Sequence, residues 1–412
     1  MIFSIKNNGN HKVISLFGIK IKLNRTAGSR KFYKLPIEPK KIVFSNFSGR
    51  GFGCNLKYIA EKLIETNKDY DLVWLCDKTF MQKENYPSKI RLVDFKSSDA
   101  IKEMITARVV ISNVHLFSLI SRGWEKRAGQ CYINTWHGSL GIKKIGSAVV
   151  SEKNRLEDRY IAEQKDSSMI DYILSNSVFD NEVFRNDLWY KGEILEFGHP
   201  RNDVFFRTDS EKELLKIKVC KELGIDVKSK IFLYVPSFRD NNNVDCYKLD
   251  VERVRQCLNN KTGEDWVVAI RLHPHLAKHS SVLFNYSDKV VDATNYSDIQ
   301  ELLVASEMAV SDYSSCIFDF MISRKPAFIY AVDIKEYNSE RGLYYPLETT
   351  PFPIATNNDD MIANIENFDE NKYREDIETF LKSKGCFEDG KASVRVSEFI
   401  AKLIDSKRRN DV

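Results

Sequence analysis

The chain has 412 residues, of which 43% are hydrophobic and 12% aromatic, so it is long enough for two domains that each bury a core. Lysine and arginine nearly balance aspartate and glutamate, and the formal net charge is +4. This balance argues against a general nucleic-acid binder, and the aromatic content argues against a disordered chain.

No part of the sequence predicts a membrane span or a secretion signal. No stretch approaches the roughly 18–20 consecutive apolar residues that cross a bilayer, and the N-terminal sequence MIFSIKNNGNHKV lacks an apolar signal core. The eight cysteines form no CxxC pair, which predicts reduced, mostly buried thiols. We therefore expect a cytoplasmic protein that can contact the cytoplasmic face of the cell membrane peripherally.

Residues 1–35 form a basic, β-rich leader that differs from the rest of the chain. Isoleucine and lysine alternate around Gly18, between positions 12 and 23, which predicts one or two short strands with a basic outer face. Two interpretations are open, a small hairpin docked on the first domain and a contact with anionic headgroups of the inner membrane leaflet. The contact with the headgroups would be worth about 1 kcal/mol for each basic residue near the membrane surface.

From residue 36 onward, short β-rich runs alternate with helical patterns, which predicts βαβ units and mainly parallel sheets. The first series, within residues 36–206, has such runs at 41–44, 72–75, 109–111, 131–133 and 172–174. The second series, within residues 207–412, has them at 231–234, 266–270, 290–291, 308–310 and 327–330. We therefore predict two doubly wound, Rossmann-like α/β domains that face each other across a cleft. Ligands of such sheets bind beyond the carboxyl ends of the strands.

Two polar clusters follow strands of the first domain. Glycines 49, 51 and 53 lie between a strand and a helix, where backbone N–H groups can approach an anion, although a flexible turn is the plainer interpretation. The run Thr135-Trp136-His137-Gly138-Ser139 follows another strand, and neutral imidazole is a suitable general base for a hydroxyl near pH 7. The alternative role for His137 is a hydrogen-bonded structural histidine.

A third cluster, Gly198-His199-Pro200-Arg201-Asn202-Asp203, also follows a strand. Its arginine and aspartate either fix the junction between the domains or contact substrate.

In the second domain, polar clusters follow three strands, at residues 236–240, 271–275 and 311–320. Arginine and imidazolium in the first two clusters are suited to a diphosphate and to charge on a leaving phosphate. Ser314 and Ser315 lie where a helix is expected to begin, and hydroxyls with free N–H groups at such a point bind phosphate without lysine. The alternative is an ordinary N-cap with Asp319 further along the helix.

Other catalytic signatures are missing from the sequence. His275 and His279 lie four residues apart, but the HExxH context of a metalloprotease is absent, and we predict no metal site. The sequence also has no Walker A motif, no GxGxxG fingerprint and no GxSxG elbow, which argues against a kinase, a dehydrogenase or a serine hydrolase.

Taken in order, the clusters resemble the motifs of the CDP-glycerol glycerophosphotransferase family, which includes teichoic-acid primases and polymerases. The resemblance runs from about residue 41 to about residue 404. Residues 135–139 are similar to the family's T-W-H-G-T, 198–203 to G-Y-P-R-N-D, 234–239 to Y-A-P-T-F-R and 272–274 to L-H-P. The most similar segment is Asp312-Tyr313-Ser314-Ser315 through Phe318-Asp319-Phe320, followed by Pro326, Asp333, Tyr337 and Arg341-Gly342.

The resemblance implies a GT-B fold and transfer of glycerol phosphate from CDP-glycerol to a hydroxyl of a lipid-linked or capsular glycan, with release of CMP. It implies His137 as the general base and His273 as the residue that binds or protonates the donor phosphate. The donor-site residues that it implies are Arg239, Ser314, Ser315, Asp319 and Arg341. On the acceptor side of the cleft we place Ser48, Gly49, Asn55, Gly138, Ser139, Arg201 and Asp203. No cofactor beyond the donor is expected, Mg²⁺ stays open, and no nucleic-acid partner is expected.

Several residues depart from the family pattern, and the changes directly after His137 fall where the acceptor is expected to lie. Ser139 stands in place of threonine, residues 140–144 (LGIKK) replace a Pro-Leu-Lys run, and His199 replaces an aromatic residue. These changes leave the acceptor open. The remaining alternatives are CDP-ribitol as donor, a GT-B glycosyltransferase that uses a nucleotide sugar, and a non-catalytic scaffold of a surface-glycan assembly.

Overall fold

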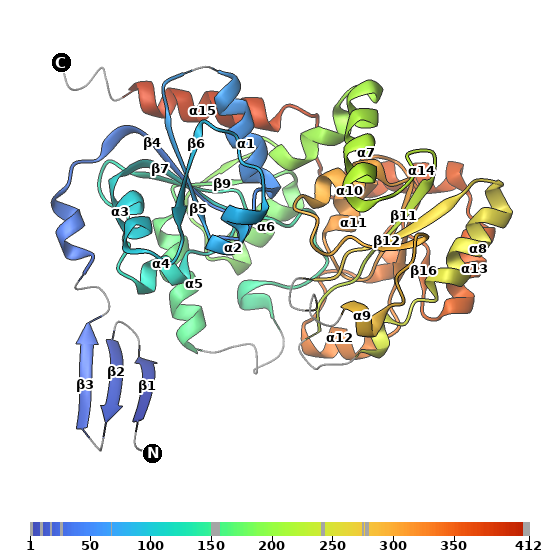
Figure 1. Ribbon diagram of the computed structural model, residues 1–412, viewed down its shortest axis with the longest axis horizontal. Coiled ribbons are helices and arrows are strands. Elements are labelled where there is room, and N and C mark those ends of the chain that lie inside the picture. The colour runs from blue at the N-terminus through green and yellow to red at the C-terminus, as the bar shows by residue number, and fades with distance from the viewer. Residues whose placement is uncertain are drawn as a thin grey trace.

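The computed structural model describes residues 3–8, 11–16, 19–24, 28–66, 68–149, 157–239, 244–273, 276 and 280–406. Across these residues the chain forms two α/β domains that lie side by side, and a small sheet at the N-terminus stands apart from them (Figure 1). Each domain has one parallel sheet with apolar cores on both faces, so the predicted fold class is confirmed.

The N-terminal sheet has three antiparallel strands, where the sequence predicted one or two. They are β1 (Phe3–Asn8), β2 (His11–Leu16) and β3 (Ile19–Asn24). The basic side chains of residues 6–25, on which the predicted membrane contact depends, lie outside the described part of the structure. That contact therefore stays a prediction.

The first domain is built on a sheet of seven parallel strands in the order β10-β9-β8-β7-β4-β5-β6. Its strands are β4 (Glu38–Ser45), β5 (Asp71–Cys76), β6 (Ile90–Asp94), β7 (Ala107–Ser112), β8 (Cys131–Asn134), β9 (Tyr172–Leu174) and β10 (Glu193–Leu195). Its helices are α1 (Cys54–Glu65), α2 (Lys78–Lys83), α3 (Ser98–Thr106), α4 (Phe117–Ser121), α5 (Glu157–Met169) and α6 (Val178–Asp187). The sequence analysis missed β6, an edge strand whose sequence IRLVD mixes polar and apolar residues.

Successive residues of a buried strand serve opposite faces of this sheet, because side chains alternate along a strand. In β4, Val43 packs on the face covered by α3, α4 and α6, while Ile42 and Phe44 pack on the face covered by α1. A strand buried on both faces has no polar position along its run, which is why residues 42–44 are continuously apolar.

The second domain has a sheet of six parallel strands in the order β13-β12-β11-β14-β15-β16. Its strands are β11 (Lys230–Val235), β12 (Trp266–Ile270), β13 (Val290–Asp292), β14 (Met308–Ser311), β15 (Ala327–Tyr330) and β16 (Ile354–Ala355). The helices after the first domain are α7 (Asp209–Leu223), α8 (Val251–Thr262), α9 (Ser280–Leu283), α10 (Ile299–Ala305), α11 (Cys316–Met321), α12 (Ile334–Glu340), α13 (Asn358–Glu366), α14 (Glu370–Ser383) and α15 (Ala392–Ser406). Short 3₁₀ turns link these elements at Arg30–Lys34, Gly146–Ala148, Pro200–Phe206, Asp245–Tyr247 and Leu347–Thr349.

The C-terminal helix corrects one predicted boundary. Helix α15 does not stay with the second domain but crosses back to lie beside α1, on top of the first sheet (Figure 1). Its Val396, Ile400 and Ile404 join the apolar core between α1 and that sheet. Residues 207–412 are therefore not one domain, because these apolar residues of α15 pack against the first sheet.

Buried ion pairs join the two domains. Lys57 of α1 reaches Asp298 and Glu301 of the second domain, with Nζ to oxygen distances of 2.7 Å to each. Burial opposes the charge on Lys57, but the two carboxylates outweigh it and raise the pKa of the lysine. Breaking such a pair leaves an uncompensated buried charge, so these contacts hold the domains in register.

No helix in the described part of the chain is long and apolar enough to cross a bilayer.

Candidate active site

A cavity of about 280 Å³ lies where the carboxyl ends of β8 and β14 face each other across the cleft. The residues that line it come from both domains. They are Trp136, His137, Gly138, Gly141, Lys143, Ile145, Phe179, Asp180, Val183, Phe184, Tyr313, Ser314, Ser315, Arg341 and Tyr344. Five of the residues predicted from the sequence, namely His137, Gly138, Ser314, Ser315 and Arg341, are thus brought together.

His137 is held as a neutral imidazole with a defined tautomer. Its Nδ1 donates a hydrogen bond to the backbone carbonyl of Asn113 at 2.8 Å, which leaves Nε2 as the acceptor nitrogen. Burial lowers the pKa of His137 to about 4, an effect that the Asn113 hydrogen bond opposes and the positive charge of Arg201 reinforces. The ring is therefore ready to accept a proton at neutral pH.

Hydrogen bonds from Asn55 hold the turn that carries His137. The Asn55 side chain donates to the carbonyls of Thr135 and Trp136 at 3.1 and 3.2 Å, and its own oxygen accepts from the Arg201 backbone N–H. Trp136 has a φ of +49°, a left-handed conformation that costs of order 1–3 kcal/mol in a residue other than glycine. Asn55 is fully buried. It positions the base and does not line the cavity.

A strap from the first domain, residues 140–145, runs along residues 341–345 of the second domain. Lys144 N–H donates to the Gly342 carbonyl at 3.1 Å, Tyr344 N–H donates to the Ile142 carbonyl at 2.8 Å, and Arg341 Nε donates to the Lys144 carbonyl at 3.1 Å. These bonds place the guanidinium of Arg341 at the cavity, beside the imidazole of His137.

The strap also carries Lys143 into the cavity. Its Nζ donates to the Ser237 hydroxyl at 3.0 Å. Burial lowers the pKa of Lys143 to about 8, while the Asp312 carboxylate opposes the shift and Arg341 adds to it. Below that pH the cavity contains two cationic side chains, those of Lys143 and Arg341.

Ser314 and Ser315 close the cavity from the second domain. A Cβ atom on Gly138 would lie 3.9 Å from Ser315 Oγ, and one on Gly141 would lie 3.7 Å from Ser315 Cβ. The serine turn and the histidine turn therefore approach each other closely, and glycine keeps the space between them open. Helix α11, which follows the serines, has only six residues. The hydroxyls and the two cations therefore dominate the attraction for an anion.

Arg239 lies behind the cavity and not in its wall. Its guanidinium forms a bidentate pair with Asp333, at 2.6 and 3.0 Å, and lies 2.9 Å from Asp312. It also lies over the stacked rings of Tyr313 and Tyr337. Nε and Nη2 of Arg239 donate to Asp333, and Nη1 donates to the Ser237 carbonyl at 2.9 Å. The geometry gives Arg239 the role of fixing the turns at Ser237 and Tyr313.

Arg201 and Asp319 form a second buried pair, at the junction of the domains. Arg201 donates to Asp319 at 2.9 and 3.2 Å and to the Ser139 hydroxyl at 2.9 Å. The Ser139 oxygen lies 2.7 Å from His199 Nδ1. This chain of contacts links the end of the histidine turn to helix α11. It stabilises the walls of the cavity through Ser139, Arg201 and Asp319, none of which lines it.

Three further candidates lie away from the cavity. Asp203 accepts from the backbone N–H groups of Ala392 and Ser393, at the start of α15. Gly49 has a φ of +95°, and a Cβ there would lie 2.8 Å from Phe95, so glycine is needed for packing. Ser48 is exposed.

His273 follows β12 on the far side of the cleft, with its ring centroid 5.5 Å from that of Phe238. Its neighbours 274, 275 and 277–279, which include the two histidines considered above as a metal pair, lie outside the described residues. Among the residues that are described, no group of three or more histidine, cysteine or acidic side chains is arranged to hold a metal ion.

The sequence analysis missed several residues that line this cavity, Lys143, Tyr313 and Asp180 among them. Lys143 occurred only as part of a departure from a family motif. Asp180 follows the short strand β9, and burial raises its pKa to about 7, although the Leu140 N–H that it accepts opposes the shift. The rule that sites lie beyond strand ends would have indicated this segment.

Two parallel α/β domains that face each other form a fold of the GT-B type. The cavity between them is lined by a neutral imidazole, two serine hydroxyls and two cations. A site of this kind suits the transfer of a phosphorylated group to a hydroxyl. The sequence profile of the CDP-glycerol:poly(glycerophosphate) glycerophosphotransferases matches residues 29–402. The chain belongs to this family, and it is therefore an enzyme of the polyolphosphotransferase class.

The chain is similar to teichoic-acid enzymes over nearly its whole length. It is 31% identical to a teichoic acid poly(glycerol phosphate) polymerase of Bacillus spizizenii, over 88% of this chain and 92% of that protein. It is 29% identical to the corresponding polymerase of Staphylococcus epidermidis over 93% of this chain, but it spans only about half, 54%, of that protein. Teichoic acid ribitol-phosphate primases and polymerases are also similar to it.

The solved structure of the wall teichoic acid polymerase TagF superposes on the chain with a TM-score of 0.80 at 26% identity, covering 93% of this chain and 94% of that one. A variant of TagF has also been solved after a soak with CDPG.

Proposed function

We propose that the protein transfers glycerol phosphate from CDP-glycerol to a hydroxyl of a teichoic-acid-type glycan, and that CMP is the leaving product. The observation that carries the proposal is the shared cavity, which is lined by His137, with its Nδ1 bonded to Asn113, together with Ser314, Ser315, Lys143 and Arg341. A base and an anion-binding wall in one cavity are what the attack of a hydroxyl on a phosphate requires.

In the proposed reaction, His137 Nε2 takes the proton of the acceptor hydroxyl as the oxygen attacks the phosphorus that carries glycerol. A new phosphorus–oxygen bond forms there, and the bond from that phosphorus to the oxygen of CMP breaks. Lys143 and Arg341 neutralise charge on the transferred phosphate, and the serine hydroxyls donate to its oxygens. His273 binds or protonates the departing CMP phosphate.

The alternatives concern the donor and whether the chain is catalytic. CDP-ribitol stays a candidate donor because ribitol-phosphate enzymes are among the similar proteins. A nucleotide-sugar transferase would also use a cleft between two such domains. A non-catalytic scaffold does not require the neutral tautomer of His137. We place the reaction at the cytoplasmic face of the membrane, with the basic N-terminal residues as the contact.

The test is release of nucleotide by the purified protein. CDP-glycerol, CDP-ribitol and a panel of UDP-sugars are each incubated with a lipid-linked disaccharide that carries one glycerol phosphate unit, and products are measured by mass spectrometry. We expect CMP from CDP-glycerol together with a glycerol phosphate added to the acceptor. A nucleoside diphosphate released from a UDP-sugar, with the CDP-polyols inert, would contradict the proposal.

A change at Lys143 should weaken donor binding. Lys143→Met removes one cation from the phosphate wall, and a hydrogen bond to a charged group is worth about 1.5–3 kcal/mol. The KM for CDP-glycerol should therefore rise by roughly 10- to 100-fold. Lys144→Met is the matched control, because Lys144 is the next residue along the chain and does not line the cavity. The KM of this variant for CDP-glycerol should stay near the wild-type value.

The same residue predicts a pH dependence of donor binding. The pKa of Lys143 is lowered to about 8, so the cation is present below that pH and is lost as the pH rises through it. The wild-type KM for the donor should therefore rise above about pH 8. The rise should be absent in Lys143→Met. An equal rise in the variant would show that another group titrates.

A further inference from the structure

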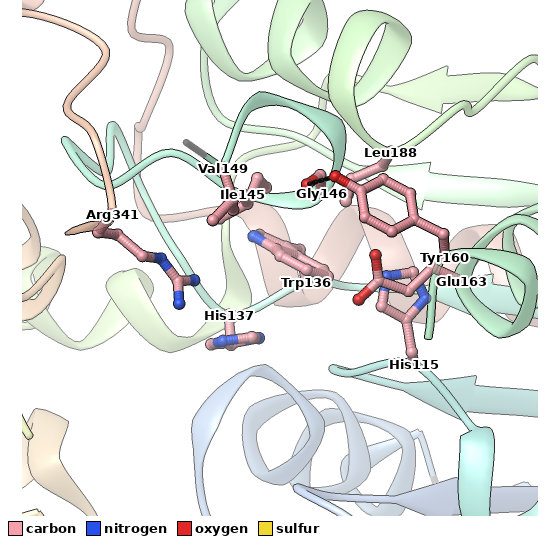
Figure 2. Close-up of a pocket in the computed structure, with 10 residues that line it drawn as sticks. All are labelled: His115, Trp136, His137, Ile145, Gly146, Val149, Tyr160, Glu163, Leu188 and Arg341. Carbon is pink, nitrogen blue, oxygen red and sulfur yellow. Dashed lines mark hydrogen bonds between the residues drawn. The ribbon is translucent and has the colours of Figure 1, made fainter. Parts of the chain in front are cut away.

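A second cavity, of about 180 Å³, extends from Trp136 and His137 into the first domain. It shares Trp136, His137, Ile145 and Arg341 with the cavity described above. Its other walls belong to the first domain, and Figure 2 shows His115, Tyr160 and Glu163 gathered on the side of Trp136 away from Arg341. The base therefore lies where two cavities of different composition meet.

His115 is fixed in this second cavity by a buried carboxylate. Its Nδ1 lies 2.8 Å from Asp166 Oδ2, and the Asp166 side chain is fully buried. The imidazole stacks on Phe117 and meets the Trp136 ring edge to face, at centroid distances of 5.1 and 5.7 Å. The ring cannot turn without losing these contacts, so Nδ1 donates to the carboxylate and Nε2 has a fixed direction.

The other nitrogen of His115 has no protein partner. The side chain is only 8% exposed, yet Nε2 has no hydrogen-bond partner among the described residues. Buried polar atoms in native proteins are nearly always paired, so an unpaired one in a residue that lines a cavity requires an explanation, and a ligand hydroxyl supplies one. Glu163, which is also buried, lines the same cavity.

The charges of the two cavities differ. Arg341 lines both, but the first also has Lys143 and two serine hydroxyls, which suits a diphosphate. In the second, a carboxylate and an imidazole acceptor face an indole ring. Hydroxyl groups can donate both to the Glu163 carboxylate and to His115 Nε2.

We propose that this second cavity binds the terminal hydroxyl-bearing unit of the acceptor, a polyol or a sugar, with His115 and Glu163 accepting hydrogen bonds from its hydroxyls. The proposal rests on the function proposed above. It places the reacting hydroxyl at His137 from the side opposite the serines. Tyr160, whose hydroxyl donates to the Gly146 carbonyl at 3.4 Å (Figure 2), completes the wall.

The test uses the KM for each substrate separately. His115→Phe keeps an aromatic ring between Phe117 and Trp136 but removes Nε2, and Glu163→Gln keeps the shape of the side chain but removes the carboxylate. Each should raise the KM for the lipid-linked disaccharide that carries one glycerol phosphate unit by about tenfold or more. The KM for CDP-glycerol and the slow release of CMP to water without acceptor should stay within about threefold.

Gln164→Ala is the matched control, since Gln164 is exposed one residue away on α5, and its KM values should equal those of the wild type. His115→Phe leaves Asp166 with only the Tyr132 hydroxyl, 3.4 Å away, and can reduce stability, so Glu163→Gln, with an unchanged thermal midpoint, decides the outcome. A rise in the donor KM instead of the acceptor KM, or no change in Glu163→Gln, would overturn the assignment while the proposed function stood. Failure of the wild type to release CMP from any CDP-polyol would overturn both.

Discussion

Replacing His137 by alanine is expected to lower kcat by about 10²–10⁴-fold, the range that general acid–base catalysis contributes. The affinity for CDP-glycerol should change little, because the cations and hydroxyls that face the donor belong to other residues. The large expected loss of kcat depends on a single atom, Nε2 of His137. With Nδ1 committed to the Asn113 carbonyl, Nε2 is the nitrogen that can take the hydroxyl proton. Steady-state kinetics, with donor binding measured by calorimetry, separates the two effects.

A second variant distinguishes the loss of a base from the loss of packing. The side-chain amide of His137→Gln can still donate to the Asn113 carbonyl but does not accept a proton near neutral pH. It should therefore lose activity nearly as far as His137→Ala while retaining the wild-type thermal midpoint. A variant that kept a tenth or more of the wild-type kcat would contradict the role of His137 as the base.

The lowered pKa also predicts how pH acts on this residue. In the folded protein His137 has a pKa of about 4, against an ordinary value of 6.5. The unfolded chain therefore takes up a proton at this site before the folded protein does, and stability falls as the pH drops from 6.5 towards 4. The kcat at saturating donor, which depends on the neutral base, should be flat above about pH 5 and fall below it. An acid limb near 6.5 would show that the imidazole is solvated.

Much of the fold could be predicted because its signals are local. Apolar runs such as 42–44 must be buried on both faces of a sheet, and their alternation with helical patterns specifies parallel strands. The same reasoning placed His137, Ser314 and Ser315 beyond strand ends, and the cavity does contain all three. The motifs added the family, which the sequence profile bears out.

The parts that were missed depend on contacts between distant segments. The spacing of residues in α15 shows an amphipathic helix but not which sheet it covers. Lys143 belongs to the cavity only because the strap that carries it pairs with residues 341–345 of the other domain. His115 resembles any polar residue after a strand until Asp166, from a helix far along the chain, fixes one of its nitrogens.

For Arg239 the sequence indicated a contact with ligand, and the structure shows contacts within the protein. This residue also gives the prediction with the largest expected effect on stability. The sequence indicated a diphosphate ligand, whereas the structure surrounds the guanidinium with Asp312 and Asp333, each side chain of the three less than a tenth exposed. Arg239→Met should therefore lower the free energy of unfolding by about 3–5 kcal/mol, because it leaves two buried carboxylates without the arginine charge that balances them. Equilibrium denaturation of the purified variant in urea measures the change.

Two matched changes test that explanation. Arg253→Ala breaks an ion pair of 2.6 Å with Asp359 on the surface of the same domain, and exposed pairs are worth only about 0–1 kcal/mol. Arg239→Met combined with Asp333→Asn should regain part of the lost stability, since it removes one of the stranded charges. If the double variant were less stable than Arg239→Met, buried charge would not be the cause. Packing of the guanidinium on Tyr313 and Tyr337 would then explain the lost stability, because both variants remove the guanidinium from these rings.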